Sequence, residues 1–171
     1  MENRPDPTPF LALLAEVQGR ARAPDMVYAA LDEALAGAVG HILCSIARHE
    51  DDAAGGRCAV RVHSNRPVPY PVGQRKRAAD APRIQALIDT GEAQLVTDPA
   101  DFRRSYPDGA GAGALGCGTA VNTPVLWQGR VLGQVNLMHR PGWYGAGDPA
   151  RIRVFAQFLV PVFLHGHAPA P

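Results

Sequence analysis

Apolar residues recur at helical spacing near both ends of the chain. This pattern predicts one helix over residues 8–22, capped by Thr8, and a second helix over residues 25–37. A third stripe begins at Asp148, followed by a proline that suits the first turn of a helix. Pro161 lies inside this last apolar stretch and should kink or end the third helix.

Between these helices the pattern changes to the alternation that is typical of strands. Residues 40–49 and 57–65 predict two antiparallel strands separated by the turn sequence DDAAGG. A short strand is predicted over 93–97, and the segments 118–127 and 130–139 predict a hairpin joined at WQGR. The early pair and the late pair most simply form one antiparallel sheet.

The segment between the two strand pairs, residues 66–116, differs from both in composition. It opens with the proline-rich RPVPYPVGQRKR, which predicts a loop, and it continues with short helices over 81–91 and 98–106. The glycine-rich segment 107–118 that follows is predicted to be flexible. The order of elements predicts an α+β fold: a central sheet with the terminal helices on one face and this insert on the other.

The late hairpin carries amides where a strand face would usually be either apolar or charged. Side chains alternate faces along a strand, so Asn122 shares one face with Gln134, Asn136 and Met138. A covered amide without a hydrogen-bond partner costs about 1–3 kcal/mol. The amides must therefore bond either a ligand in a pocket beneath the insert or the backbone of the insert itself, and both alternatives remain open.

Three aromatic residues of the insert, Tyr70, Phe102 and Tyr106, could form the walls of such a pocket, or seal the insert onto the sheet. Met138 would supply an adaptable apolar contact.

The hairpin also supports a resemblance to a known family. The segment NTPVLWQGRVLGQVNL resembles the GAF-domain pattern xxVPV…G+ΦΦGxΦNL, in which Φ is apolar, and the YPVGQRK loop before it resembles the family as well. The element order matches over residues 10–164. The resemblance implies a sheet of five or six antiparallel strands, helices on one side and a ligand cavity on the other, into which Asn122, Asn136 and Met138 would face. GAF domains bind cyclic nucleotides, bilins, haem, oxo-acids or other small molecules, usually to regulate an output domain.

The resemblance leaves the ligand open. The NKxDE motif of cyclic-nucleotide members and the PxSDIP type of motif of bilin-binding members are both absent. We expect residues 1–171 to form a single GAF domain with a flexible tail over 165–171 and no output domain of its own, so that a separate protein would read its state. GAF domains commonly dimerise through terminal helices, and the strongly apolar FAQFLVPVF segment favours a homodimer here.

The cysteines and histidines bear on catalysis and metal binding. The three cysteines Cys44, Cys58 and Cys117 are an odd and sparse count, which favours reduced thiols in a cytoplasm over a disulfide scaffold. They form no CxxC pair, so we do not expect a structural zinc site. We expect a bacterial protein with no metal site and no cofactor. Cys117 lies in the glycine-rich loop, at the mouth of the expected pocket. One group of GAF proteins reduces free methionine-R-sulfoxide with cysteines, and this resemblance makes Cys117 a candidate catalytic thiol. His63 is expected to be solvated at a strand end.

The charge composition narrows the range of partners. The net charge of +1 gives no reason to expect nucleic acid or an anionic membrane surface as a partner, and no apolar run approaches the roughly 20 residues of a membrane helix. The locally basic Arg75, Lys76 and Arg77 are either a solvated loop or the rim of an anion site.

The amide face and the resemblance together predict a sensory domain that binds a small organic molecule. The alternatives are a thiol enzyme using Cys117 and a dimeric interaction protein that binds no ligand.

Overall fold

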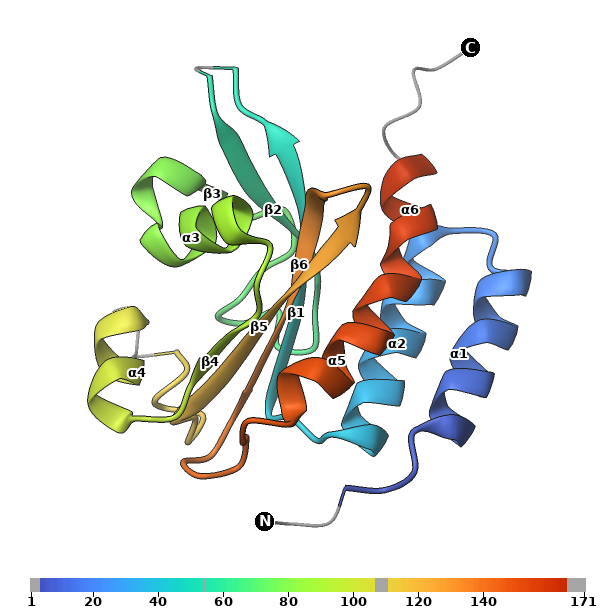
Figure 1. Ribbon diagram of the computed structural model, residues 1–171, viewed down its shortest axis with the longest axis horizontal. Coiled ribbons are helices and arrows are strands. Elements are labelled where there is room, and N and C mark those ends of the chain that lie inside the picture. Colours follow the sequence, from blue (N-terminus) through green and yellow to red (C-terminus); the bar gives the residue numbers. More distant parts are fainter. Residues whose placement is uncertain (1–3, 54, 107–110, 166–171) are drawn as a thin grey trace.

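The computed structural model describes residues 4–53, 55–106 and 111–165 of the 171-residue chain. These residues form one six-stranded antiparallel sheet with helices on both of its faces (Figure 1). The strand order is β3-β2-β1-β6-β5-β4. The strands span Leu43–Asp51 (β1), Arg57–Ser64 (β2), Arg75–Arg77 (β3), Gln94–Val96 (β4), Thr119–Trp127 (β5) and Arg130–His139 (β6). The long pairings β1–β2 and β5–β6 are the two predicted hairpins, and β1 joins them by pairing with β6.

The helices divide between the two faces of the sheet as predicted (Figure 1). One face is covered by the terminal helices, which are α1 (Thr8–Arg20), α2 (Pro24–Ala38), α5 (Asp148–Ala156), a 3-10 turn (Gln157–Leu159) and α6 (Val160–His165). Over the other face lie the 3-10 turn η1 (Ala78–Asp80), α3 (Pro82–Thr90) and α4 (Pro99–Ser105). The predicted α+β layer architecture is confirmed.

The main hydrophobic core lies between the sheet and the terminal helices. Val121 and Val125 of β5 and Val135 and Leu137 of β6 are fully buried in it. Their side chains point to the face of the hairpin opposite the amides, which the alternation predicts to pack on the helices. The opposite parity faces the insert, and there the register places Asn122 directly opposite Asn136.

Pro161 has the predicted effect on the last helix. The α-helical hydrogen bonding of α5 stops at Ala156, a 3-10 turn follows, and a new helical segment begins at Val160. Pro161 cannot donate a backbone hydrogen bond to an earlier turn, which accounts for an interruption in this region. Phe155 and Phe163 on either side of the break are both fully buried against the core.

Two local details differ from the prediction. Thr8 does not cap α1 but is its first residue. Its backbone N–H donates a hydrogen bond to the Asp6 carboxylate at 3.0 Å, so the side chain that accepts at this end of the helix is that of Asp6. The predicted loop 66–77 contains the short strand β3, which pairs Arg77 with Cys58 and Arg75 with Val60. The exposed edge of β2 supplies hydrogen-bond partners for this strand, and local composition carries no signal of that edge.

Within the described part of the chain, no helix is long and apolar enough to cross a membrane.

Candidate functional site

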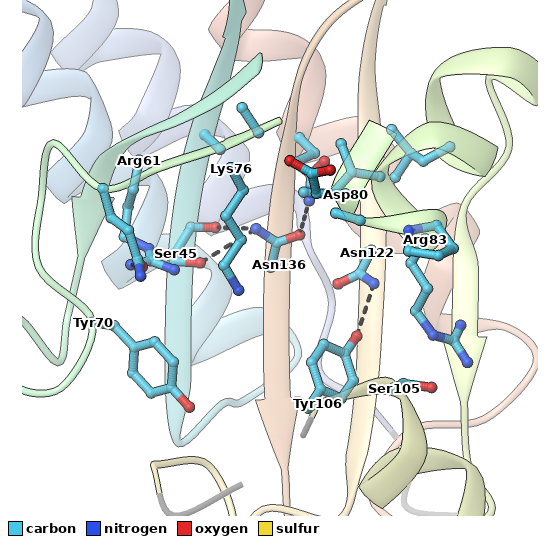
Figure 2. A pocket seen from close by; sticks show the side chains of 18 of the residues that line it. Ser45, Arg61, Tyr70, Lys76, Asp80, Arg83, Ser105, Tyr106, Asn122 and Asn136 are labelled. Carbon is cyan, nitrogen blue, oxygen red and sulfur yellow. Dashed lines mark hydrogen bonds between the residues drawn. The ribbon is translucent and has the colours of Figure 1, made fainter. Parts of the chain in front are cut away.

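A cavity of about 990 Å³ opens between the sheet and the insert (Figure 2). Its volume lies at the upper end of the range that is usual for small-molecule sites. Strands β1, β2, β5 and β6 contribute residues to its lining from the sheet, and β3, η1, α3 and the end of α4 contribute the rest together with Tyr70 and Tyr106. The lining residues used below are Ser45, Arg61, Tyr70, Arg75, Lys76, Arg77, Asp80, Arg83, Arg104, Tyr106, Asn122, Gln134, Asn136 and Met138.

The floor of the cavity is a network of uncharged polar side chains. Asn136 Nδ2 lies 3.3 Å from Ser45 Oγ, and its Oδ1 accepts from Gln134 Nε2 at 2.5 Å. Asn122 Nδ2 donates to the Tyr106 hydroxyl at 2.8 Å (Figure 2). In the described residues, the partners of these amides are other side chains and the β1 backbone, rather than the loop backbone of the insert.

The sequence correctly placed this polar face, but it did not indicate Ser45. The signal was available in the alternation of β1, where Leu43, Ser45 and Ala47 line the cavity while Cys44 and Ile46 are buried against the helices. Register decides that Ser45 pairs with Asn136 across the β1–β6 ladder.

Positive charge is concentrated around this polar floor. The cavity is lined by six cationic side chains and by only one carboxylate, that of Asp80. The whole chain, by contrast, has a net charge of only +1. The cations are Arg61, Arg75, Lys76, Arg77, Arg83 and Arg104. The sequence singled out only the consecutive three, because the others come from β2, α3 and α4.

Ion pairs with residues outside the cavity hold several of these cations in place. Arg75 contacts Glu50 at 3.0 Å, and Arg83 contacts Asp101 at 3.0 Å. The Arg75 side chain is about half exposed, so such a pair adds little stability but restrains the guanidinium group. Figure 2 shows Lys76 and Arg83 on opposite sides of the amides.

Solved structures with the same fold are known, although no protein-family model and no curated protein matches the sequence. The GAF domain from an Acinetobacter phosphoenolpyruvate-protein phosphotransferase superposes with a TM-score of 0.74 at 14% identity, over 98% of this chain and 97% of that chain. The corresponding domain from Coxiella burnetii gives a TM-score of 0.71 at 18% identity, over 95% and 96%. The phycocyanobilin-bound GAF domain of a cyanobacterial phytochrome gives 0.68 at 15% identity, over 97% and 100%.

The chain has the GAF fold. The similarity extends over nearly the whole chain, and it agrees with the resemblance carried by the β5–β6 hairpin. At identities this low, the superpositions establish only the arrangement of the backbone. The chemistry of the cavity must therefore be derived from the side chains of this chain.

The aromatic residues proposed as walls of the GAF cavity divide into two groups. Tyr70 and Tyr106 line it. Phe102 does not: it is 3% exposed and packs in a second apolar cluster, with its ring 4.9 Å from that of Tyr106. Phe102 therefore positions Tyr106, and the expectation that Phe102 itself forms a cavity wall is corrected.

Cys117 is also placed differently from the expectation. It lies in the same apolar cluster as Phe102 and is absent from the cavity lining, so it is not at the mouth of the pocket. Burial raises the pKa of its thiol to about 11, which disfavours the thiolate that a nucleophilic cysteine needs. All three cysteines are buried and free, and this arrangement gives no support to thiol-dependent reduction.

Of the eight residues predicted to contact a ligand, six share the cavity. They are Asn122, Gln134, Asn136, Met138, Tyr70 and Tyr106.

Proposed function

We propose that this GAF domain is a sensor that binds a small organic anion between its sheet and the insert. The single observation that supports the proposal most strongly is the lining of the cavity, which combines amides and tyrosines with six cationic side chains. Such a lining can bind a carboxylate or phosphate group while still orienting an uncharged polar part of the same molecule.

Each part of the cavity has a distinct role in this proposal. Lys76 and Arg83 would attract the negative group, and their positions on opposite walls suit a ligand that spans the cavity. Asn122 and Asn136 would accept from and donate to the rest of the ligand, and Tyr106 would exchange its bond with Asn122 for one with the ligand. Asp80, the one carboxylate in the lining, would accept a hydrogen bond from a ligand hydroxyl or ammonium group.

The neighbouring structures are compatible with a sensory role. Proteins of this fold include a phycocyanobilin-bound GAF domain and a domain of a two-component sensor histidine kinase protein from Sinorhizobium meliloti. By analogy, we infer that ligand binding orders the insert over the cavity and that another protein reads this change. We further infer that the domain works as a homodimer through its terminal helices.

The first experiment is a thermal-shift screen against small carboxylates, phosphates, amino acids and their uncharged amide or ester analogues. A ligand present at 100 times its Kd should stabilise the fold by about 2.7 kcal/mol, which corresponds to a rise in Tm of several degrees. The proposal expects anions to raise the Tm and their uncharged analogues to fail. A library that raises the Tm nowhere, or that favours the uncharged analogues, would refute it.

Two substitutions then connect a binding anion to the cavity. Lys76→Met removes one charge while keeping an apolar stem, and it should weaken anion binding by about 10- to 100-fold, the usual value of a charge-assisted hydrogen bond. Arg20→Met is the matched control because Arg20 is exposed in α1 on the opposite face of the sheet. Asn136→Leu should abolish binding without unfolding the protein. Normal binding by the Asn136 variant would show that the amide floor has no part in recognition.

A further inference from the structure

A second cluster of polar side chains lies on the other face of the sheet, beneath α2. Asp32 of α2 accepts hydrogen bonds from two histidines: His41 Nε2 lies 2.9 Å from Oδ1, and His63 Nε2 lies 2.7 Å from Oδ2. The thiol of Cys44 in β1 completes the cluster, since one ligand atom each of Asp32, His41 and Cys44 lies within 4.8 Å of the other two. His63 is therefore not the solvated strand-end residue that the sequence predicted.

The cluster is unusual for its depth. Cys44 is fully buried and the His41 side chain is only 3% exposed, while those of Asp32 and His63 are 15% and 20% exposed. Burial and the neighbouring Asp32 carboxylate raise the pKa of the Cys44 thiol well above its usual range. An ordinary core position next to β1 would hold apolar groups, so four polar groups converging here need a physical reason.

The donor atoms of Asp32, His41 and Cys44 match the preferences of zinc. Zn²⁺ binds imidazole nitrogen, thiolate sulfur and carboxylate oxygen in a tetrahedron, with bonds of roughly 2.0–2.3 Å. These bond lengths set the ligand atoms about 3.4 Å apart. The 2.9 Å contact between His41 and Asp32 would therefore widen by about half an ångström to admit the ion, and the Cys44 thiol already lies within 4.8 Å of both ligand atoms. His63 lies outside this trio and holds the other carboxylate oxygen of Asp32 at 2.7 Å.

We propose that Asp32, His41 and Cys44 bind a zinc ion, and that His63 orients the Asp32 carboxylate from its other oxygen. Three positions would come from the protein and the fourth from water, and the site would tie α2 to β1. Binding releases the thiol proton of Cys44. The proton that His41 Nε2 donates to Asp32 moves to Nδ1 by exchange with solvent, so that the neutral ring coordinates through Nε2. The site is separate from the anion cavity, since Cys44 and the cavity-lining Ser45 point to opposite faces of β1.

The decisive measurement uses Co²⁺ as a spectroscopic probe for zinc. The purified full chain is treated with a chelator, returned to a reducing buffer and titrated with Co²⁺. The proposal expects one equivalent of Co²⁺ to produce a near-ultraviolet thiolate-to-cobalt band together with the intense visible bands of a tetrahedral ion. Added Zn²⁺ should remove both bands and raise the Tm.

Substitutions assign the signal to this cluster. Cys44→Ala should abolish the thiolate-to-cobalt band, and Cys58→Ala, a change of another buried cysteine, should leave it intact. His63→Ala, at the most exposed of the four residues, should retain the fold and bind Zn²⁺ at least about tenfold more weakly, because the Asp32 carboxylate loses the group that orients it. A His165→Ala, His167→Ala double variant controls for binding at the C-terminal histidines and should bind as the unmodified chain does.

Three outcomes would overturn the proposal. The first is a Co²⁺ complex without the thiolate band, and the second is Zn²⁺ affinity that His63→Ala leaves unchanged. The third is loss of binding in the His165, His167 double variant. If Cys44→Ala does not fold, the His63 variant and the spectrum of the unmodified chain still decide.

Discussion

His49 should make the protein less stable in mild acid. Its imidazole is fully buried in β1, where Nε2 lies 3.0 Å from Gln134 Oε1. Within the described residues, Nδ1 has no hydrogen-bond partner. Burial disfavours the charged imidazolium and lowers the pKa of His49 from 6.5 to about 4, against a smaller opposing effect of the Gln134 hydrogen bond.

The direction and size of the effect follow from the two pKa values. Between pH 6.5 and 4, the unfolded chain takes up a proton at this residue that the folded chain refuses, so acidification favours unfolding. Above pH 6.5 both states are neutral at His49 and the contribution is constant. The free energy of unfolding should fall by about 2 kcal/mol between pH 8 and pH 5, and by roughly 3 kcal/mol once the pH is below 4.

Urea denaturation at a series of pH values from 8 to 4.5, followed by circular dichroism, measures this contribution directly. His49→Gln retains an amide that can bond Gln134 but cannot titrate, so its unfolding free energy should depend less on pH by about 2 kcal/mol at pH 5. Asp32 has a lowered pKa, held down by His41 and His63 against the effect of burial, and its contribution is lost only in stronger acid. Parallel pH profiles for the variant and the unmodified chain would refute the assignment to His49.

Three further predictions concern packing, thiol reactivity and assembly. Gly133→Ala should destabilise the fold by about 1–3 kcal/mol, because a Cβ there would lie 2.5 Å from the Phe163 ring. Gly145→Ala is the control, since a Cβ there meets open space and should have little effect on stability. Urea denaturation compares the two variants. Cys117 should react with iodoacetamide at pH 8 much more slowly than a free thiol, since burial raises its pKa to about 11; labelling at the free-thiol rate in the folded protein would contradict this. Val154 on α5 is 52% exposed. If the terminal helices form a homodimer interface, Val154→Asp should convert the dimer to a monomer in light scattering. An unchanged mass would place the interface elsewhere.

The parts of the fold that could be predicted are those with a local period. The amide parity of β5 and β6 is one example, because side-chain direction alternates along any strand and needs no knowledge of the partner. The break near Pro161 is another, since a missing N–H acts within one helical turn. Gly91 ends α3 as expected, with a φ of 65° that glycine adopts without steric cost.

The parts that could not be predicted depend on contacts between distant segments. The edge strand β3 forms because β2 offers free backbone groups, and the sequence of residues 75–77 reads equally well as a solvated basic loop. Phe102 and Cys117 were expected at the cavity, but they turn into an adjoining apolar cluster whose other members come from several elements. Local patterns do not say which of two neighbouring apolar spaces a side chain fills.

Periodicity and one contiguous motif therefore specify most of the element types, the two faces of the sheet and the GAF-like hairpin, but not the edge strand β3. Only the tertiary structure gathered the six cations around the amides and brought Asp32, His41, Cys44 and His63 together. Strand register and the packing of α2 on the sheet set these distances, and both arise from the summed burial of the core rather than from the spacing of the residues themselves.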